Sequence, residues 1–268
     1  MVRYEQMAER FGSWQLEALL AVGGLAEVWR AQRGDGELAA VKRLHTHLLR
    51  NPIALTQFAI EQSLATSLVP HPNLIHASES GTALGRPYVA LEYIPGKDLR
   101  RAMADESSAV TTARAIAIVA AACDAAAHLH SQGWIHGDIQ PANLMVDLLE
   151  PHGRVVLIDL GVARRAGEAG TVRGTHAYMA PEQIRGEAWA PATDVFALGV
   201  VLWELVAKTR LFHRGPPWLS MAAVMETDPP PLSDPEVDAI VRGALEKRGD
   251  ARIPSPADFA AALRGLHR

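Results

Sequence analysis

The sequence predicts an α+β fold of two lobes, in which a small strand-rich lobe precedes a larger helical one. Short β-type segments separated by glycines occupy the first third of the chain, and one helical pattern interrupts them. After Gly96 the pattern becomes helical. The 268 residues contain no linker, repeat or low-complexity tract that would divide them into independent units, so we expect one domain.

Five short segments of the first lobe have the composition of β-strands. They are short segments with several apolar residues, and glycines punctuate this part of the chain at positions 23, 24, 34, 36, 81 and 85. The expected strands are 14–21, 26–31, 38–43, 74–79 and 87–92.

One helix is expected inside this strand-rich lobe. Asn51 is a good N-cap, and Pro52 suits the first helical position. The inward face should carry Glu61, Leu64 and Leu68, because residues i, i+3 and i+7 line up along a helix. A carboxylate therefore shares a face with two leucines.

The second lobe contains three segments with clear helical patterns. The alanine-rich segment 112–131 is closed by Gly133, and segment 194–207 is apolar on nearly every side. The latter is expected to be the buried centre of this lobe. Near the end of the chain, Ser255 is an N-cap for a last surface helix that includes Phe259.

Composition excludes several classes of function. Lysine and arginine number 26 against 30 acidic residues, and the net charge of −4 argues against nucleic-acid binding. The single Cys123 cannot form an internal disulfide, which fits a reducing compartment. Residues 1–11 do not form a signal peptide, and charged or titratable residues interrupt the most apolar stretch, 113–129. We expect a cytoplasmic chain without a membrane segment, and an anchor outside it stays open.

A turn with two glycines, Gly23 and Gly24, joins the first two expected strands. Small residues there let backbone N–H groups approach a phosphate closely. A hairpin that requires glycine for a positive φ angle would have the same sequence. The turn alone is compatible with both interpretations.

Lys42 follows three apolar residues at the end of an expected strand. If its ammonium points into a cleft it needs an anionic partner, and Glu61 is the candidate. A surface lysine and an unrelated helix glutamate would give the same pattern, so the pair needs further support.

That support comes from polar residues in segments 134–145 and 157–161. Asp138 is placed to accept a hydroxyl proton, Asn143 follows five residues later, and Asp159 follows a turn. Two carboxylates and a side-chain amide in this order are suited to hold metal ions against a triphosphate.

On these residues the chain resembles the eukaryotic-type protein kinase family in its bacterial form. Segment 174–182 is similar to the end of an activation segment, and segment 194–199 to the start of the central helix. The matches keep the family order from the glycine turn to Arg252, which matches the arginine that pairs with Glu182. They cover all but about the first dozen residues.

The resemblance implies a protein-kinase-like two-lobe fold, with ATP in the cleft between the lobes. An antiparallel lobe with one helix would span 12–92, a hinge 93–98 and a helical lobe 99–268. The expected reaction is transfer of the γ-phosphoryl group of ATP to serine or threonine hydroxyls of a protein. The sequence does not identify the substrate protein, and autophosphorylation is compatible with the same reaction.

The resemblance also implies roles for five residues. Lys42 matches the lysine that holds the α- and β-phosphates and pairs with the counterpart of Glu61. Asp138 matches the catalytic base. Asn143 and Asp159 match the ligands of Mg²⁺, for which Mn²⁺ is a possible substitute.

Further matches concern the nucleotide. Leu91 stands at the gatekeeper position, and the residues after it would offer backbone groups to adenine. Three apolar residues would sandwich the base, although apolar residues at such places are usually plain core. Asp98 stands where a ribose contact would fall, and it is equally suited to cap a helix. The matched positions are Ala21, Gly23, Gly24, Val28, Ala40, Lys42, Leu91, Glu92, Ile94, Asp98 and Met145.

The glycine turn and the catalytic loop depart from the family pattern. Ala21 and Ala26 replace two glycines of the loop, which should be tolerated. Gly137 replaces the arginine that receives an activation-loop phosphate. Phosphorylation of Thr171 or Thr175 is therefore not expected to be an on-switch.

The most serious departure is Gln140, which replaces the lysine that contacts the γ-phosphate in serine/threonine kinases. Ala142 does not supply the arginine that tyrosine kinases use instead. Such a cation contributes about 2 to 4 kcal/mol to the transition state. Two alternatives to an active protein kinase follow: a pseudokinase that binds nucleotide and acts as a scaffold or allosteric partner, and a small-molecule phosphotransferase of the aminoglycoside or choline kinase type.

Residues 216–218, Pro-Pro-Trp, lie between two expected helices. An exposed Trp218 would be able to dock a partner, but a packed loop is the interpretation we favour.

Overall fold

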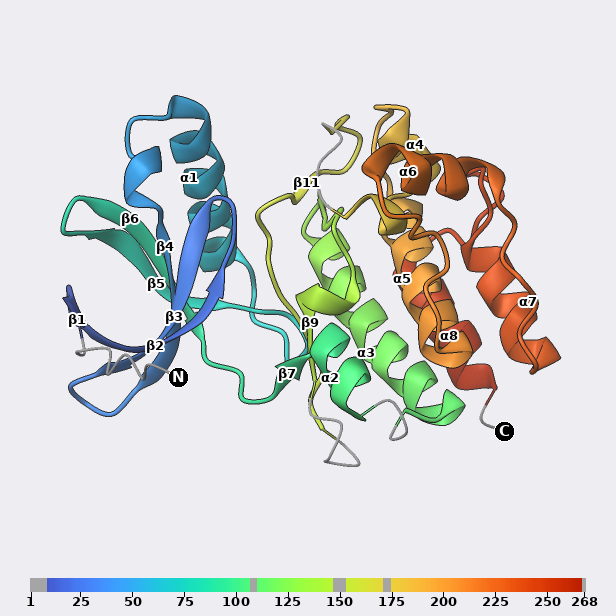
Figure 1. Cartoon of the computed structure of the whole chain (residues 1–268), viewed down its shortest axis with the longest axis horizontal. Helices are drawn as coiled ribbons and strands as arrows, with labels where there is room; N and C mark the ends of the chain where they lie inside the picture. The colour runs from blue at the N-terminus through green and yellow to red at the C-terminus, as the bar shows by residue number, and fades with distance from the viewer. Residues whose placement is uncertain (1–8, 107–109, 147–152, 171–174, 267–268) are drawn as a thin grey trace. The chain divides into compact units, whose positions relative to one another are not determined.

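The computed structural model divides into two compact units (Figure 1). It describes residues 9–106, 110–146, 153–170 and 175–266. Unit 1 comprises Met1–Pro70 and Ile75–Pro95, and unit 2 comprises His71–Leu74 and Gly96–Arg268.

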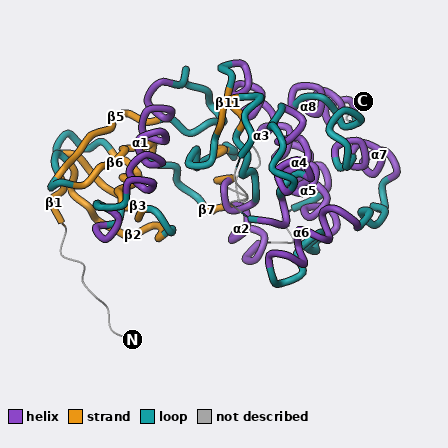
Figure 2. Tube along the Cα trace, turned by 90° about the horizontal axis from the view of Figure 1, so that it is seen from above, coloured by secondary structure: helices purple, strands orange, loops and turns teal. Residues whose placement is uncertain are grey.

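Unit 1 is an antiparallel sheet with one helix, α1 (Pro52–Ser67), packed against β5 and β6. The strand order is β1-β2-β3-β4-β6-β5. The strands are β1 Glu9–Phe11, β2 Trp14–Val22, β3 Ala26–Arg33, β4 Leu38–Leu44, β5 Ala77–Ala83 and β6 Arg86–Glu92, and a short 3₁₀ helix covers Thr46–Leu48. Figure 2 shows this unit as the strand-rich part of the chain.

One strand of the sheet, β5, differs from the prediction at both of its ends. The strand expected at 74–79 begins only at Ala77, because Leu74 instead forms bridges with His71 and Leu157 in unit 2. The turn after β5 then uses Leu84 and Gly85, which both have positive φ angles of 48° and 74°. This two-residue turn matches the twist of the paired strands.

The first strand of the sheet was not predicted. β1 pairs with β2, and Phe11 at its end is fully buried in the core of the sheet.

The helix of unit 1 begins and packs as predicted. The side chain of Asn51 accepts hydrogen bonds from the backbone N–H groups of Ile53 and Ala54, which caps α1. Glu61, Leu64 and Leu68 are all buried, although Leu68 lies one residue past the end of the helix. A carboxylate is therefore held within an apolar surface, where it needs a partner.

Unit 2 consists mainly of helices. Its helices are α2 Leu99–Glu106, α3 Thr112–Ser131, α4 Pro181–Ile184, α5 Pro191–Ala207, α6 Pro217–Glu226, α7 Pro235–Ala244 and α8 Pro256–Gly265. Short strands are β7 Lys97–Asp98, β8 Trp134–Ile135, β9 Leu144–Val146, β10 Val156–Leu157 and β11 Arg164–Arg165, and 3₁₀ turns cover Pro141–Asn143 and His176–Tyr178.

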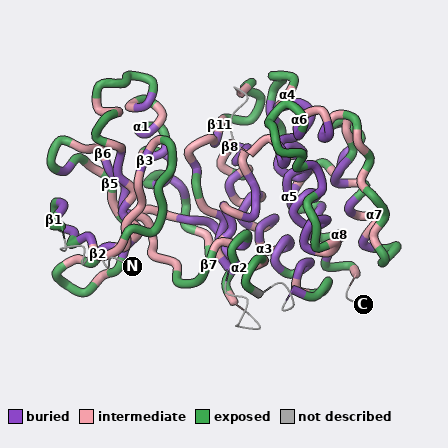
Figure 3. Tube along the Cα trace, viewed as in Figure 1, coloured by how far each residue is buried: buried purple, intermediate pink, exposed green. Residues whose placement is uncertain are grey.

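The central helix α5 is buried over nearly its whole length. Every residue from Ala192 to Leu205 is buried, and Figure 3 shows this helix in the colour of buried residues. The prediction of a buried centre is confirmed, although the helix begins at Pro191, three residues earlier than expected.

The helix α3 lies in the interior of unit 2. It is long and apolar enough to cross a membrane by length and composition, despite the charged residues noted in its sequence. Half of its residues, including Cys123, are buried, and it packs against α5 and α8. These contacts are typical of the core helix of a globular domain.

The prediction of a packed loop at 216–218 is wrong. Pro217 begins α6, and Trp218 in its first turn keeps 65% of its surface exposed. The proline starts a helix because it needs no N–H partner there, and this turn points the tryptophan outward.

Candidate active site

Lys42 and Glu61 form an ion pair inside unit 1. Lys42 lies on β4 and Glu61 on α1, and their side chains keep only 14% and 4% of their surface exposed. Burial of either charge alone would be costly, so the two side chains fix each other's position. The structure thus supplies the anionic partner that the sequence analysis assigned to this lysine.

The glycines between β2 and β3 are not required by the turn itself. Neither Gly23 nor Gly24 has a positive φ angle. A methyl group at Gly24 would meet no atom within 4 Å, and one at Gly23 would make only an ordinary contact with the Ala26 carbonyl oxygen at 3.5 Å. β2 and β3 do form an antiparallel hairpin around this turn, but the expectation that the turn requires glycine for a positive φ angle is wrong. The open space beside the two glycines is compatible with the close approach of a ligand.

The apolar residues matched to adenine are not plain core. In unit 1, Val28, Ala40 and Leu91 are partly exposed, whereas their neighbours Ala39 and Ala90 are buried. Ala40 is paired with Leu91 across β4 and β6. These side chains thus lie on the face of the sheet that the core of the unit does not fill.

Two other matched positions lie in the small sheet of unit 2. Met145 on β9 is partly exposed and pairs with Asp98 on β7. The Asp98 carboxylate accepts a hydrogen bond from the backbone N–H of Arg101 at 3.0 Å, which caps α2. The capping interpretation of Asp98 thus has a contact that supports it.

Asp138 is at the centre of a hydrogen-bonded loop in unit 2. Asn143 Nδ2 donates to Asp138 Oδ2 at 3.0 Å and to the Asp138 carbonyl oxygen at 2.8 Å. Gln140 Nε2 lies 3.1 Å from both carboxylate oxygens of Asp138. The Thr175 N–H donates to Oδ1 at 3.4 Å. The carboxylate is oriented by uncharged amide groups from three directions.

The environment of Asp138 also affects its proton affinity. Burial raises the pKa of Asp138 above the ordinary value of an aspartate, and the nearby carboxylate of Asp159 acts in the same direction. A charge on His136, the Thr175 N–H and the Gln140 amide act against this rise without cancelling it.

Gln140 links the catalytic loop to Thr175, which lies in the segment matched to the end of the activation segment. Its Oε1 accepts a hydrogen bond from Thr175 Oγ1 at 2.7 Å, while its Nε2 faces Asp138. Only 7% of the surface of Gln140 is exposed. The side chain that replaces the family lysine therefore makes two directed contacts.

Hydrogen bonds to the Asp194 carboxylate hold the start of the catalytic loop in place. The backbone N–H groups of His136 and Gly137 donate to the Asp194 carboxylate at 2.9 and 2.8 Å, and His130 Nε2 lies 2.7 Å from it. Burial alone would raise the pKa of Asp194, but the contacts with His130, His136 and Gly137 hold it below its ordinary value. The loop is thereby attached to the first turn of α5.

Asn143 and Asp159 offer oxygen ligands to a cation. Because the Asn143 amide nitrogen donates to Asp138, its carbonyl oxygen is the atom able to coordinate a metal. Asp159 is exposed and has a φ angle of 67°, and the backbone N–H of Gly161 donates to its Oδ1 at 3.3 Å. Mg²⁺ prefers such hard oxygen donors, with phosphate and water completing its coordination. Among the described residues, no three His, Cys, Asp or Glu side chains form a complete metal site.

Arg252 and Glu182 form a buried bidentate ion pair. Arg252 Nη1 and Nη2 donate to the two carboxylate oxygens at 2.8 and 3.0 Å, and Thr193 Oγ1 adds a third contact at 2.9 Å. Burial would raise the pKa of Glu182, but the bonds from Arg252 and Thr193 lower it. The pairing expected from the sequence is present. Of the segment around it, Thr171 and Gly174 lie outside the described residues.

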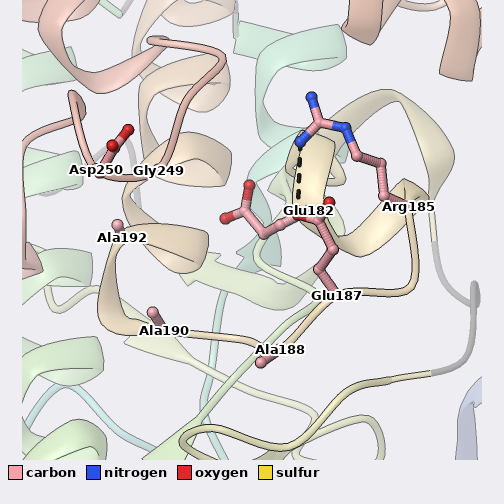
Figure 4. Close-up of a pocket in the computed structure, with 8 residues that line it drawn as sticks. All are labelled: Glu182, Arg185, Glu187, Ala188, Ala190, Ala192, Gly249 and Asp250. Atoms are coloured by element: carbon pink, nitrogen blue, oxygen red, sulfur yellow. Dashed lines mark ion pairs between the residues drawn. The ribbon is translucent and has the colours of Figure 1, made fainter.

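A separate hollow of about 270 Å³ lies beside this pair (Figure 4). It is lined by residues of α4, of the start of α5 and of the connection between them, and by Gly249 and Asp250, so the polar residues of the catalytic loop do not face it. Arg185 and Glu187 form an ion pair at 3.5 Å on its rim. The hollow is not the candidate active site.

Comparisons with known proteins agree on the family. The family model described as protein kinase domain matches residues 14–252. The serine/threonine-protein kinase PknB of Mycolicibacterium smegmatis is 32% identical over 287 residues, covering 100% of this chain and 44% of that protein. PknJ of Mycobacterium tuberculosis, another serine/threonine-protein kinase, is 30% identical over 93% of this chain and 44% of its own length.

A third relative and a solved structure add to this. The tyrosine-protein kinase MasK of Myxococcus xanthus is 31% identical, covering 96% of this chain and 43% of that protein. The chain thus spans less than half the length of these curated relatives. The crystal structure of the Mycobacterium tuberculosis PknI kinase domain matches with a TM-score of 0.74 and 24% identity, covering 96% of this chain and 98% of that one. This likeness shows the fold.

Proposed function

Since the chain belongs to the protein kinase family, we propose that it transfers the γ-phosphoryl group of ATP to serine or threonine hydroxyls of proteins. The observation that carries this proposal is the Asp138 carboxylate, oriented by Gln140, Asn143 and Thr175 in one loop. Phosphoryl transfer depends mainly on positioning and charge stabilisation, and this loop is built for positioning.

Residues of unit 1 are assigned to the nucleotide. The ammonium of Lys42, fixed by Glu61, would hold the α- and β-phosphates. The backbone around Ala21, Gly23 and Gly24 would approach the phosphates, because no side chain fills the space beside the two glycines.

The adenine contacts are assigned by exposure and resemblance together. Val28, Ala40 and Met145 would contact the base, and Leu91 would limit how deeply the base is inserted, since all four side chains are partly exposed. Backbone groups of Glu92 and Ile94 would pair with adenine, and Asp98 would be near the ribose; its contact with Arg101 leaves further acceptor capacity on the carboxylate.

Asn143 and Asp159 would hold Mg²⁺, or Mn²⁺ in its place. When bound, the ion neutralises the charge of the phosphate oxygens and favours transfer. The two residues present fit such a cation, because both supply oxygen ligands and the Asn143 amide nitrogen is already engaged with Asp138.

Asp138 would orient the attacking hydroxyl and accept its proton. A carboxylate offers about four acceptor positions, and Gln140, Asn143 and Thr175 contact all four here. Gln140 makes two contacts of equal length with one amide group, so a substrate hydroxyl can replace one of them without the loss of the other.

The type of hydroxyl and the alternatives depend on further observations. The named relatives include both serine/threonine and tyrosine kinases. Ala142 does not provide the arginine associated with tyrosine kinases, which favours serine or threonine. All three relatives are protein kinases, and no observation favours a small-molecule substrate. The retained set of Lys42, Glu61 and Asp138 argues against a pseudokinase.

The location and the protein substrate are part of the proposal. The one cysteine, Cys123, is buried and has no partner for an internal disulfide, which supports a reducing compartment such as the cytoplasm. Autophosphorylation is included as a reaction to be measured.

The test is transfer of labelled phosphate from ATP, with Mg²⁺ and separately with Mn²⁺, to the protein itself and to a generic basic protein. Asp138→Asn should abolish transfer while nucleotide still raises the melting temperature. Asp105→Asn, an exposed aspartate of α2, is the matched control and should retain transfer. Retained transfer in Asp138→Asn would refute the mechanism. Phosphoamino-acid analysis of the product distinguishes serine and threonine from tyrosine.

A further inference from the structure

We propose that Trp189 acts as a wedge that orders residues 164–170, the start of the activation segment, by packing, so that this segment needs no phosphate to be held against the catalytic loop. We call Trp189, Gly137 and Gly170 the tryptophan wedge. This inference concerns the regulation of the proposed kinase and rests on that proposed function.

The indole ring of Trp189 occupies space beside two glycines that are far from it in sequence. Only 1% of Trp189 is exposed. A methyl group at Gly137 would lie 2.1 Å from Cζ3 of the ring, and one at Gly170 would lie 2.1 Å from Cζ2. Both distances are far shorter than van der Waals contact. While the ring is in place, neither position accommodates any side chain.

Backbone hydrogen bonds attach the same residue to the activation segment. The Gly167 N–H donates to the Trp189 carbonyl oxygen at 2.9 Å, and the Trp189 N–H donates to the Glu168 carbonyl oxygen at 3.0 Å. Ala169 and Ala188 form an antiparallel bridge next to them. The segment therefore contacts Trp189 through both its backbone and its ring.

The other side of the wedge is equally fixed. The Gly137 N–H donates to Asp194 at 2.8 Å, and the Gly137 carbonyl oxygen accepts from Gln183 Nε2 at 2.9 Å. Gly137 thus cannot move away from the ring without breaking two buried hydrogen bonds. The ring joins the activation segment to a loop that is itself held by α5 and α4.

Two arginines of this segment lie over aromatic rings, one of them over the ring of Trp189. The guanidinium of Arg164 lies 5.7 Å from the centre of the Trp189 ring, and that of Arg165 lies 4.3 Å from the Trp134 ring. Arg165 Nη1 also donates to the Gln132 carbonyl oxygen. A phosphate would need several charge-assisted donors, and the residue before Asp138, Gly137, has no side chain to provide one. The ring of Trp189 occupies the space that a side chain at position 137 would need.

A mutant cycle tests whether the ring and the glycines are coupled. Gly170→Ala should raise the hydrogen-exchange rates of the Ala166, Gly167 and Trp189 amides about tenfold or more, because the methyl group displaces the ring. The same change in a Trp189→Leu background should add less than about a twofold increase, since the clashing ring atoms are absent. Gly249→Ala, where a methyl group would meet no atom within 4 Å, is the matched control.

Phosphatase treatment tests the independence from phosphate. The wild-type protein, shown by mass spectrometry to carry no phosphate, should keep its slow exchange in 164–170. Thr171→Ala should keep it as well. Where transfer is measurable, initial rates of the treated and untreated protein should agree within about twofold.

The outcomes separate this inference from the proposed kinase activity. Hydrogen exchange is measured without ATP, so retained protection with no transfer would refute only the activity. If phosphatase treatment or Thr171→Ala increases exchange in 164–170 about tenfold, or if Gly170→Ala has the same effect with and without the Trp189 ring, the wedge is refuted.

Discussion

Replacement of Arg252 by methionine should destabilise unit 2 by about 3 to 5 kcal/mol, because it leaves a buried carboxylate without its cation. The Arg252 side chain is fully buried, and the Glu182 side chain keeps 11% of its surface exposed. The guanidinium also donates to the carbonyl oxygens of Glu246 and Ala192 at 2.9 and 2.7 Å. The loss corresponds to a fall in Tm of about 6 to 20 °C for a cooperative unit of 150 to 250 residues.

The assay is equilibrium unfolding by urea, followed by circular dichroism and repeated with thermal unfolding. Arg248→Met is the matched control, because Arg248 pairs with Asp250 at 2.6 Å on the surface, where the two side chains keep 78% and 69% exposed. This variant should change stability little. Glu182→Gln combined with Arg252→Met should recover part of the loss, since no unpaired charge remains. A loss below about 1 kcal/mol in Arg252→Met, or a double variant as unstable as the sum of both single changes, would refute the reasoning.

Three further predictions concern the site. Gln140→Lys should preserve or raise turnover, because an ammonium can donate to Asp138 as the amide does; a large loss in steady-state kinetics would show that the Gln140 amide has a specific role. Lys42→Met should raise the Kd for ATP by calorimetry, whereas Lys97→Met should not, and equal values would contradict the assignment of Lys42. Asp194→Asn should weaken the loss of unfolding free energy at acid pH. The pKa of Asp194 is lowered in the folded protein, so its stabilising effect is complete above about pH 4 and is lost as pH falls through the pKa of the folded state. An unchanged midpoint of acid unfolding in this variant would refute the prediction.

Much of the fold was predictable because local signals and burial agree. Asn51 followed by proline marks the start of α1, and the uninterrupted apolar pattern of α5 marks the centre of unit 2. The limits of β5 were not predictable, since the segment that begins at Leu74 has the composition of a strand, but Leu74 itself pairs with residues of unit 2. The exposure of Trp218 was also missed, because the proline before it is compatible with both a loop and a first helical turn.

The candidate site was only partly predictable. The contact between Asp138 and Asn143 was predictable from their spacing, because a separation of five residues in one loop lets their side chains meet. The bond from Thr175 to Gln140 joins residues 35 positions apart, and no local pattern indicates it. Trp189 was missed for the same reason. In the sequence, the role of Trp189 is indicated only by two distant glycines, Gly137 and Gly170. Their connection with Trp189 is recognisable only when the structure places the ring beside them.

The attachment of the catalytic loop to Asp194 makes this loop a reporter of the whole unit. The amides of His136 and Gly137 donate to a carboxylate on the most buried helix, so they cannot reach solvent by a small loop movement. Their exchange with deuterium should require the opening that also exposes α5. The slowest-exchanging amides near the reacting groups would then measure the free energy of unfolding of unit 2. Any mutation in the core of α5 would be detected at the catalytic loop.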